Sequence, residues 1–244
     1  MLVQRSQPPP VLEPPSPLLL DKDVWLTQSA ARRKVARPAH NQPPVQAHDI
    51  ATPSIQSPAR PSTPTPTPNT TFKVRPATIS DAPLIVQLGA SVFSATFGFS
   101  MPTSDLNAYL QESYNIEAIE DDIKSPTKHV FVACPPSNPS QILGFAQLTE
   151  GTTEPCLEEI EGLVELQRLY VNRDAQGTGV GKALVAKVDS LARERGYRNI
   201  WLGVWEGNFV AQKCYESLGW ERVGDHEFRM GRCIQTDWIM CKRL

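Results

Sequence analysis

The chain has 244 residues, a formal net charge of −2, 23 prolines and five cysteines. No apolar run approaches the ~18 residues that a membrane-spanning helix needs, and the length suggests one or two domains. We expect neither a membrane nor nucleic acid as a partner of this chain.

The cysteines contain no C-x-x-C pair and are odd in number, so they predict neither a zinc site nor a disulfide framework, and we expect no metal. This usage fits a reducing, intracellular location. We expect the cytoplasm, with the nucleus left open as the alternative. The five residues are Cys134, Cys156, Cys214, Cys233 and Cys241.

The first 70 residues differ sharply in composition from the rest. They hold 15 of the 23 prolines, in runs such as PPP and TPTPTP, and a single aromatic residue, Trp25. Such a segment cannot bury enough apolar surface to offset the entropy lost on ordering. We therefore predict a disordered, proline-rich tail over residues 1–70 and one domain over residues 71–244.

Residues 71–244 alternate between strand and helix patterns, judged by β-branched content, apolar spacing and capping residues. Strands are expected at 72–77, 129–134, 141–150, 162–171, 199–204, 220–225 and 233–244. Helices are expected from Ser80 to Phe97, from Ser104 to Tyr114, over 116–124, from Val180 to Gly196, and from Asn208 to Leu218. This order predicts an α/β or α+β fold with a mixed sheet of about seven strands flanked by helices.

The run AQGTGVGKAL, residues 175–184, lies between a predicted strand and a predicted helix. It is not a P-loop, because Gln176 stands where the first glycine belongs and Ala183 where the hydroxyl belongs. It is not a dinucleotide fingerprint either, because Lys182 replaces the third glycine. A glycine-rich turn at a helix N-terminus still exposes backbone N–H groups that favour an anion such as pyrophosphate. A plain tight turn is the alternative.

Read as Q-x-x-G-x-G, this run resembles the acetyl-CoA-binding motif of the GNAT N-acetyltransferases. A second motif of this family is similar to residues 208–220, NFVAQKCYESLGW, which have an asparagine at the expected helix start and a tyrosine near the helix end. The resemblance implies a mostly antiparallel GNAT sheet and acetyl-CoA as co-substrate. The stretches FSATFGF, VGDHEFRMG and QTDWIMCK are further similar to PaiA-type spermidine/spermine acetyltransferases, so the resemblance spans about residues 72–244.

By this resemblance, the glycine run holds the pyrophosphate of acetyl-CoA. The pantetheine arm pairs with the end of the preceding strand and acts as an extra strand between strands 162–171 and 199–204. Asn208 is expected to hydrogen-bond the arm and also to cap its helix. The implied cofactor-binding residues are Leu169, Tyr170, Val171, Gln176, Gly177, Thr178, Gly179, Val180, Gly181, Lys182 and Asn208.

Two residues are candidates for proton transfer. The resemblance makes Tyr215 the general acid that protonates the leaving thiolate, against the alternative of a packed core tyrosine. Glu165 is the candidate general base, acting through a water, against the alternative of a surface carboxylate. Strand alternation predicts that Glu165 shares a face with Gln167, Leu169 and Val171. His226 is interpreted as a surface or strand histidine.

The implied function is direct acetyl transfer to a primary amine, with a polyamine or another small amine as acceptor. A protein or peptide N-acetyltransferase and a non-catalytic acyl-CoA-binding module are the alternatives. We expect a monomer or homodimer. The acidic groups at 120–122 and 154–161 are interpreted as solvated faces, with capture of a polycation as the alternative.

Overall fold

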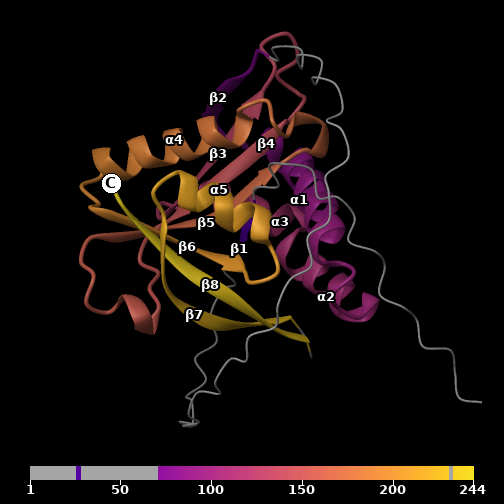
Figure 1. Ribbon diagram of the computed structural model, residues 1–244. Coiled ribbons are helices and arrows are strands. Elements are labelled where there is room, and N and C mark those ends of the chain that lie inside the picture. The colour runs from indigo at the N-terminus through magenta and orange to yellow at the C-terminus, as the bar shows by residue number, and fades with distance from the viewer. Residues whose placement is uncertain (1–25, 29–70, 231–232) are drawn as a thin grey trace, which may run out of the picture.

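The computed structural model describes residues 26–28, 71–230 and 233–244 (Figure 1). Within these residues, seven strands form an open sheet in the order β2-β3-β4-β5-β6-β8-β7, and β1 pairs with β5. The pairs within the seven-stranded sheet are antiparallel except β5 with β6. The strands are β1 (Leu26–Gln28), β2 (Lys73–Pro76), β3 (Lys128–Cys134), β4 (Gly144–Thr149), β5 (Leu163–Val171), β6 (Asn199–Trp205), β7 (Glu221–Met230) and β8 (Cys233–Arg243).

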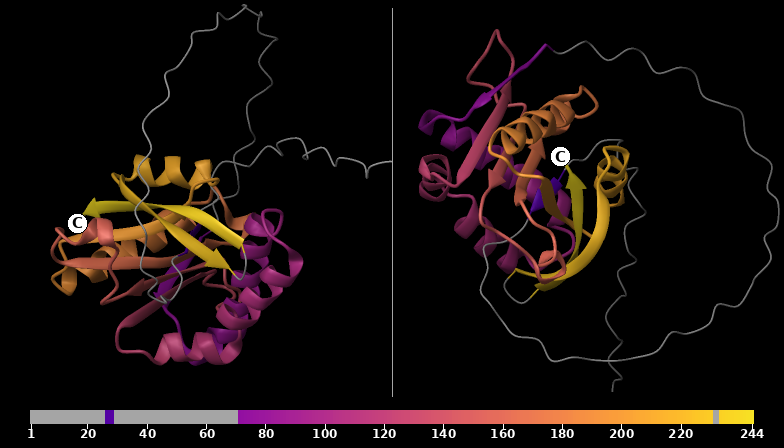
Figure 2. Two further views of the ribbon diagram at one scale, coloured as in Figure 1. Left: turned by 90° about the horizontal axis from the view of Figure 1, so that it is seen from below. Right: turned by 90° about the vertical axis from the view of Figure 1, so that its left-hand side faces the viewer.

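Five α-helices cover the two faces of the sheet, which Figure 2 shows from two sides. Helices α1–α3 lie over one face, around a core that includes Phe93, Tyr109 and Tyr170. Helices α4 and α5 lie over the other face, around a core that includes Leu184 and Tyr215. The helices are α1 (Ala82–Phe97), α2 (Thr103–Ser113), α3 (Ile116–Lys124), α4 (Val180–Glu194) and α5 (Phe209–Ser217). The predicted mixed α/β fold is confirmed.

Element ends differ from the predictions in a few places. Residues Ile79–Asp81 form a 3-10 turn before α1, and the Asp81 carboxylate accepts the Thr78 N–H at 2.7 Å, so Ser80 is not the N-cap. Helix α2 begins at Thr103, one residue before the expected Ser104. Strand β7 continues to Met230, five residues past the expected end, because it pairs with β8 along its whole length.

The parallel pair β5–β6 is short, and this opens the middle of the sheet. Pairing runs from Leu163 with Asn199 to Glu165 with Trp201, although β5 continues to Val171 and β6 to Trp205. Beyond Glu165 the edge of β5 that faces β6 has no partner in β6. Its other edge pairs with β4 as far as Val171.

Strand β1 pairs antiparallel with this open edge of β5. Leu26 lies opposite Tyr170, Thr27 opposite Leu169 and Gln28 opposite Arg168. The sequence had predicted disorder throughout residues 1–70, and this strand departs from that prediction. The rest of the predicted tail lies outside the described residues, where disorder stays a prediction.

Candidate functional site

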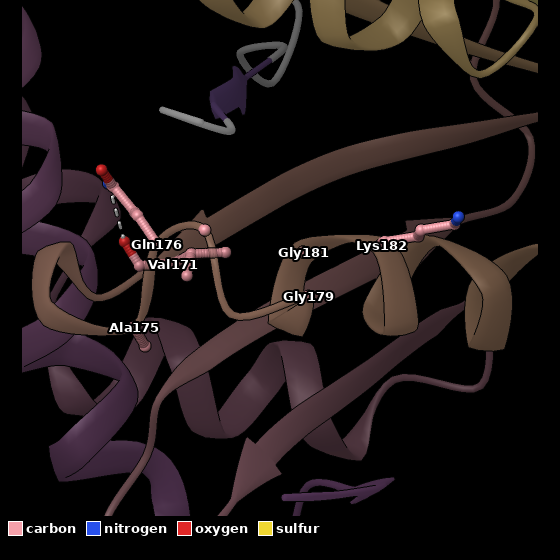
Figure 3. Close-up of a pocket in the computed structure, with 7 residues that line it drawn as sticks. Val171, Ala175, Gln176, Gly179, Gly181 and Lys182 are labelled. Atoms are coloured by element: carbon pink, nitrogen blue, oxygen red, sulfur yellow. Dashed lines mark hydrogen bonds between the residues drawn. The ribbon is translucent and has the colours of Figure 1, made fainter. Parts of the chain in front are cut away.

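A pocket of about 190 Å³ lies where β5 runs into α4 (Figure 3). Strand β5 ends at Val171, a 3-10 turn spans Arg173–Ala175, and α4 begins at Val180. The pocket is lined by Val171, Ala175, Gln176, Gly177, Gly179, Gly181 and Lys182. Six of these seven were predicted as cofactor-binding residues, so the structure brings the strand end and the glycine run together around one hollow.

The backbone of the glycine run presents donors to this pocket. The first helical backbone bond of α4 runs from Ala183 N–H to Gly179 O at 3.0 Å. The N–H groups of Val180, Gly181 and Lys182 precede that bond and have no acceptor within the helix. They lie at the positive end of the helix dipole, which favours an anion.

Two glycines give the turn its shape. Gly177 and Gly179 adopt φ of 73° and 88°, in the left-handed region that side chains with a Cβ rarely enter. Thr178 lies between them and donates its hydroxyl to Ala175 O at 2.5 Å, which closes the turn. Gln176 at its head donates to Val171 O at 3.5 Å, a long hydrogen bond.

Asn208 lies between the end of β6 and the start of α5. Its Oδ1 accepts the Ala211 N–H at 3.1 Å, so it caps α5. Its Nδ2 atom is buried and has no hydrogen-bond partner among the described residues. A buried donor without a partner carries a desolvation penalty of about 1–3 kcal/mol, which a ligand that accepts from it would remove. Asn208 therefore caps α5 through Oδ1, and its Nδ2 group remains able to donate a hydrogen bond to a ligand.

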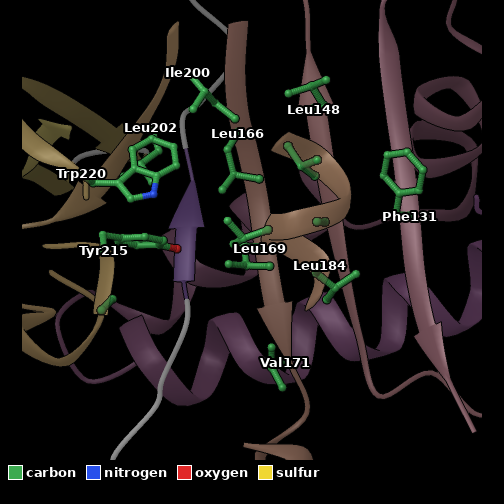
Figure 4. Close-up of a cluster of buried hydrophobic side chains, with 14 of the residues drawn as sticks. Phe131, Leu148, Leu166, Leu169, Val171, Leu184, Ile200, Leu202, Tyr215 and Trp220 are labelled. Atoms are coloured by element: carbon green, nitrogen blue, oxygen red, sulfur yellow. The ribbon is translucent and has the colours of Figure 1, made fainter. Parts of the chain in front are cut away.

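Tyr215 lies near the end of α5 and is fully buried. Its ring packs edge-on against Trp220, with ring centroids 5.8 Å apart. In Figure 4 its hydroxyl points from α5 toward β1, on the side of Leu169. Tyr215 is therefore a packed core residue, and its hydroxyl is at the same time directed toward the opening between β5 and β6.

Glu165 is also fully buried, but it does not share a face with Tyr215. Its neighbours Val164 and Leu166 belong to the core beneath α4 and α5, so Glu165 faces the opposite side of the sheet. The surface-carboxylate alternative for Glu165 is wrong.

The predicted alternation along β5 fails because the strand contains a bulge. The pairing with β4 shifts between Gln147 and Leu148, which places Gln167 out of register. Gln167 accepts hydrogen bonds from Gln147 at 2.7 Å and Thr149 at 2.9 Å. Thr149 also lies opposite Glu165, which puts Gln167 and Glu165 on one face. Leu169 and Val171 lie on the other face, with the α4 core.

A buried group of titratable residues lies next to Glu165, and the sequence interpretation missed it. His226 Nδ1 lies 3.2 Å from Glu154 Oε1, and His226 Nε2 lies 3.9 Å from Asp237 Oδ2. Burial raises the pKa of Asp237 to about 7, although His226 lowers it. The sequence carried one signal for this group. The charged residue Asp237 stands in the apolar strand QTDWIM, two residues before Ile239 and four before Cys241, so strand alternation places it on the same face as these apolar residues.

His226 lies on strand β7, in line with the strand interpretation, but it is partly buried and so is not a surface residue. Burial lowers its pKa, but the hydrogen bond that the imidazole donates to Glu154 and the charges of Asp237 and Glu165 outweigh that effect, so the pKa of His226 is raised. Glu154 is buried as well, which corrects its interpretation as solvated charge. Asp122 is likewise buried, and it pairs with Lys128 and Arg168.

Within ranges 71–230 and 233–244, no cluster of His, Cys, Asp or Glu has the arrangement of a metal site. Among the described helices, none is long and apolar enough to cross a membrane.

Solved structures share this fold at low sequence identity. The PaiA N-acetyltransferase of Thermoplasma acidophilum, solved in complex with coenzyme A, superimposes with a TM-score of 0.58 at 18% identity, covering 71% of this chain and 99% of that one. This likeness concerns the fold.

Sequence relatives match over most of the domain. An N-acetyltransferase of Lactobacillus delbrueckii subsp. lactis, itself described as uncharacterized, is 27% identical over 175 residues, 72% of this chain and 99% of the relative. Another, from Mycobacterium bovis, is 26% identical over 159 residues, 64% of this chain and 95% of the relative. The model of the acetyltransferase (GNAT) family matches residues 99–220, half of the chain, and this range contains both the glycine run and the Asn208–Trp220 segment. The chain belongs to the acetyltransferase (GNAT) family.

Proposed function

We propose that residues 71–244 form an acetyl-CoA-dependent N-acetyltransferase that transfers the acetyl group directly to a primary amine. The observation that carries this proposal is the pocket at the start of α4, where Val171 and the glycine run surround unpaired helix N–H groups. A pyrophosphate suits such a site because it is anionic and accepts several hydrogen bonds. The coenzyme A bound to the PaiA relative of the same fold adds support.

The residues between this pocket and Tyr215 also fit acetyl-CoA as the acetyl donor. A pantetheine arm carries two amides, which can pair with strand backbone, and β5 offers an edge beyond Glu165 that β6 does not use. The buried Nδ2 of Asn208 would donate to a carbonyl of the arm. Bound acetyl-CoA supplies an activated thioester carbonyl.

This chain's own residues then handle protons. An alkylammonium has a pKa of roughly 10.4, like that of lysine, so the acceptor must lose a proton before it attacks. Glu165 is the proposed base, acting through a water, and the neighbouring group of Glu154, His226 and Asp237 would pass the proton onward. Tyr215 is the proposed acid for the departing sulfur, and it lies in the core on the face of the sheet opposite Glu165.

The proposed acceptor is a small polyamine. Its support is the buried acidic group formed by Glu154, Glu165 and Asp237, because carboxylates of low exposure favour a nearby ammonium group. The similarity to PaiA-type enzymes in the stretches that surround this group points the same way.

Incubation of the full chain with acetyl-CoA and a panel of amines tests the proposal. We expect thiol release above the rate without acceptor for spermidine or spermine. Release that never exceeds the rate without acceptor, across polyamines, monoamines and peptides, would exclude catalysis. Turnover with peptides and not with polyamines would keep the acetyltransferase and overturn the acceptor.

A further inference from the structure

We propose that the segment Leu26–Gln28 is an intramolecular competitor of acetyl-CoA, occupying the edge of β5 with which the pantetheine arm would pair. The inference rests on the proposed function, because it needs the donor to bind along β5. It adds a regulatory contact built from the chain's own N-terminal region.

The pairing register carries the inference. Strand β1 lies opposite Arg168, Leu169 and Tyr170 of β5, and two of these are residues predicted to meet the pantetheine arm. The opposite edge of β5 is taken by β4 over the same residues, with Ala146 opposite Leu169 and Phe145 opposite Tyr170. A backbone N–H or C=O on this edge serves one strand-like partner at a time. Strand β1 and a pantetheine arm on this edge therefore exclude each other.

Strand β1 also fills the space between the diverging strands. Its Cα atoms come within 8 Å of both β5 and β6, although β5 and β6 stop pairing at Glu165 and Trp201. Figure 4 shows β1, in indigo, between β5 and the side chain of Tyr215, whose hydroxyl points at it. The docked segment thus occupies the proposed path of the pantetheine arm along β5.

The sequence around β1 suits this role. Residues 18–37 form the longest proline-free stretch of the first 70 residues, and β1 lies near its middle. Proline cannot donate to a strand ladder, so this stretch keeps the N–H groups that pairing requires. It also contains VWLT, residues 24–27, whose β-branched and aromatic residues favour an extended strand.

Competition between β1 and the pantetheine arm lowers the apparent affinity of the protein for acetyl-CoA. The apparent dissociation constant rises by the inverse of the open fraction, so a segment docked in nine molecules of ten weakens binding about tenfold. Because the segment belongs to the same chain, the effect does not depend on protein concentration. Saturating acetyl-CoA displaces the segment by mass action.

The test compares coenzyme A binding by three full-length proteins, measured by calorimetry. The Thr27→Pro, Gln28→Pro double variant removes two N–H donors from β1. The Ser54→Pro, Ile55→Pro double variant places two prolines outside β1 and serves as the matched control. We expect the dissociation constant to fall roughly three- to tenfold in the first variant and to stay unchanged in the control.

Amide hydrogen exchange at residues 168–170 provides the second readout. Without coenzyme A, we expect faster exchange there in the β1 variant than in the unmodified chain or the control. Equal coenzyme A affinity in all three proteins would overturn the inference and leave the proposed function standing, as would an equal gain in the control. Failure of all three to bind coenzyme A would overturn the proposed function and the inference with it.

Discussion

His226 and Asp237 lie side by side on β7 and β8, with 3.9 Å between His226 Nε2 and Asp237 Oδ2, and both have raised pKa values. Burial holds the pKa of Asp237 at about 7, against an ordinary value of 3.8. Glu154 and Glu165 face the same histidine, and Glu206 adds further negative charge near Asp237. Protonation of this pair is therefore linked to folding.

The first prediction concerns stability against pH. Asp237 binds its proton more tightly when folded, so its contribution is complete below about pH 4 and is lost as pH rises through about 7. The raised pKa of His226 acts in the same direction, since its contribution is lost as pH rises through the folded value. Asp237→Asn should flatten this decline and stabilise the protein at pH 8 by on the order of 2 kcal/mol. Urea unfolding from pH 4 to pH 8 measures it, and an unchanged pH slope in the variant would contradict the assignment.

Tyr215→Phe should lower kcat by about 100-fold and leave the dissociation constant of coenzyme A nearly unchanged. The substitution removes the hydroxyl that points toward the opening and keeps the ring contact with Trp220. Steady-state kinetics with calorimetry separate the two effects. Tyr197→Phe, in the connection between α4 and β6, is the control. An unchanged kcat for Tyr215→Phe would exclude Tyr215 as the acid.

Glu165→Gln should lower kcat by about 100-fold and remove the acidic limb of the pH–rate profile, because an amide cannot accept the proton. The change is nearly isosteric, which suits a residue with 0% exposure. His226→Gln is the competing variant. Loss of that limb with His226→Gln and not with Glu165→Gln would transfer the role of base to the histidine.

Gly179→Ala should weaken coenzyme A binding. An added Cβ would meet nothing within 4 Å, so the substitution acts through the backbone, whose φ of 88° strains any L side chain by about 1–3 kcal/mol. Relief of that strain would move the N–H groups at the start of α4.

Gly196→Ala is the matched control for that experiment. Gly196 follows α4 at its far end, has φ of 82° and equally open space around its Cα. We expect both variants to lose similar stability in thermal melts and only Gly179→Ala to lose affinity. An equal loss of affinity would show that the pocket is not the binding site.

Asn208→Asp should reduce coenzyme A affinity about tenfold without uncapping α5. A carboxylate oxygen can still accept the Ala211 N–H, while the unpartnered Nδ2 donor is lost. Asn208→Ala loses the helix cap as well, so its free energy of unfolding should fall by about 1 kcal/mol and its melting temperature should fall with it. Unaltered affinity in Asn208→Asp would restrict this residue to its capping role.

The sequence by itself determined the order of the elements in residues 71–244 and the position of the phosphate-type turn. Apolar periodicity and capping residues are local signals, so 116–124 was predicted residue for residue and α4 to within two residues of its end. The glycine run was readable for the same reason, because glycine by its own chemistry tolerates the positive φ that Gly177 and Gly179 adopt.

Only the tertiary structure decided which side chains meet. A single bulged residue, Gln167, moved Leu169 and Val171 to the face opposite Glu165, and no period-two pattern reveals a bulge that depends on the pairing partner. The approach of His226 to Asp237 and the pairing of Leu26–Gln28 with β5 depend on long-range strand pairing. Their energies come from burial and backbone bonds between distant segments, which local sequence does not encode.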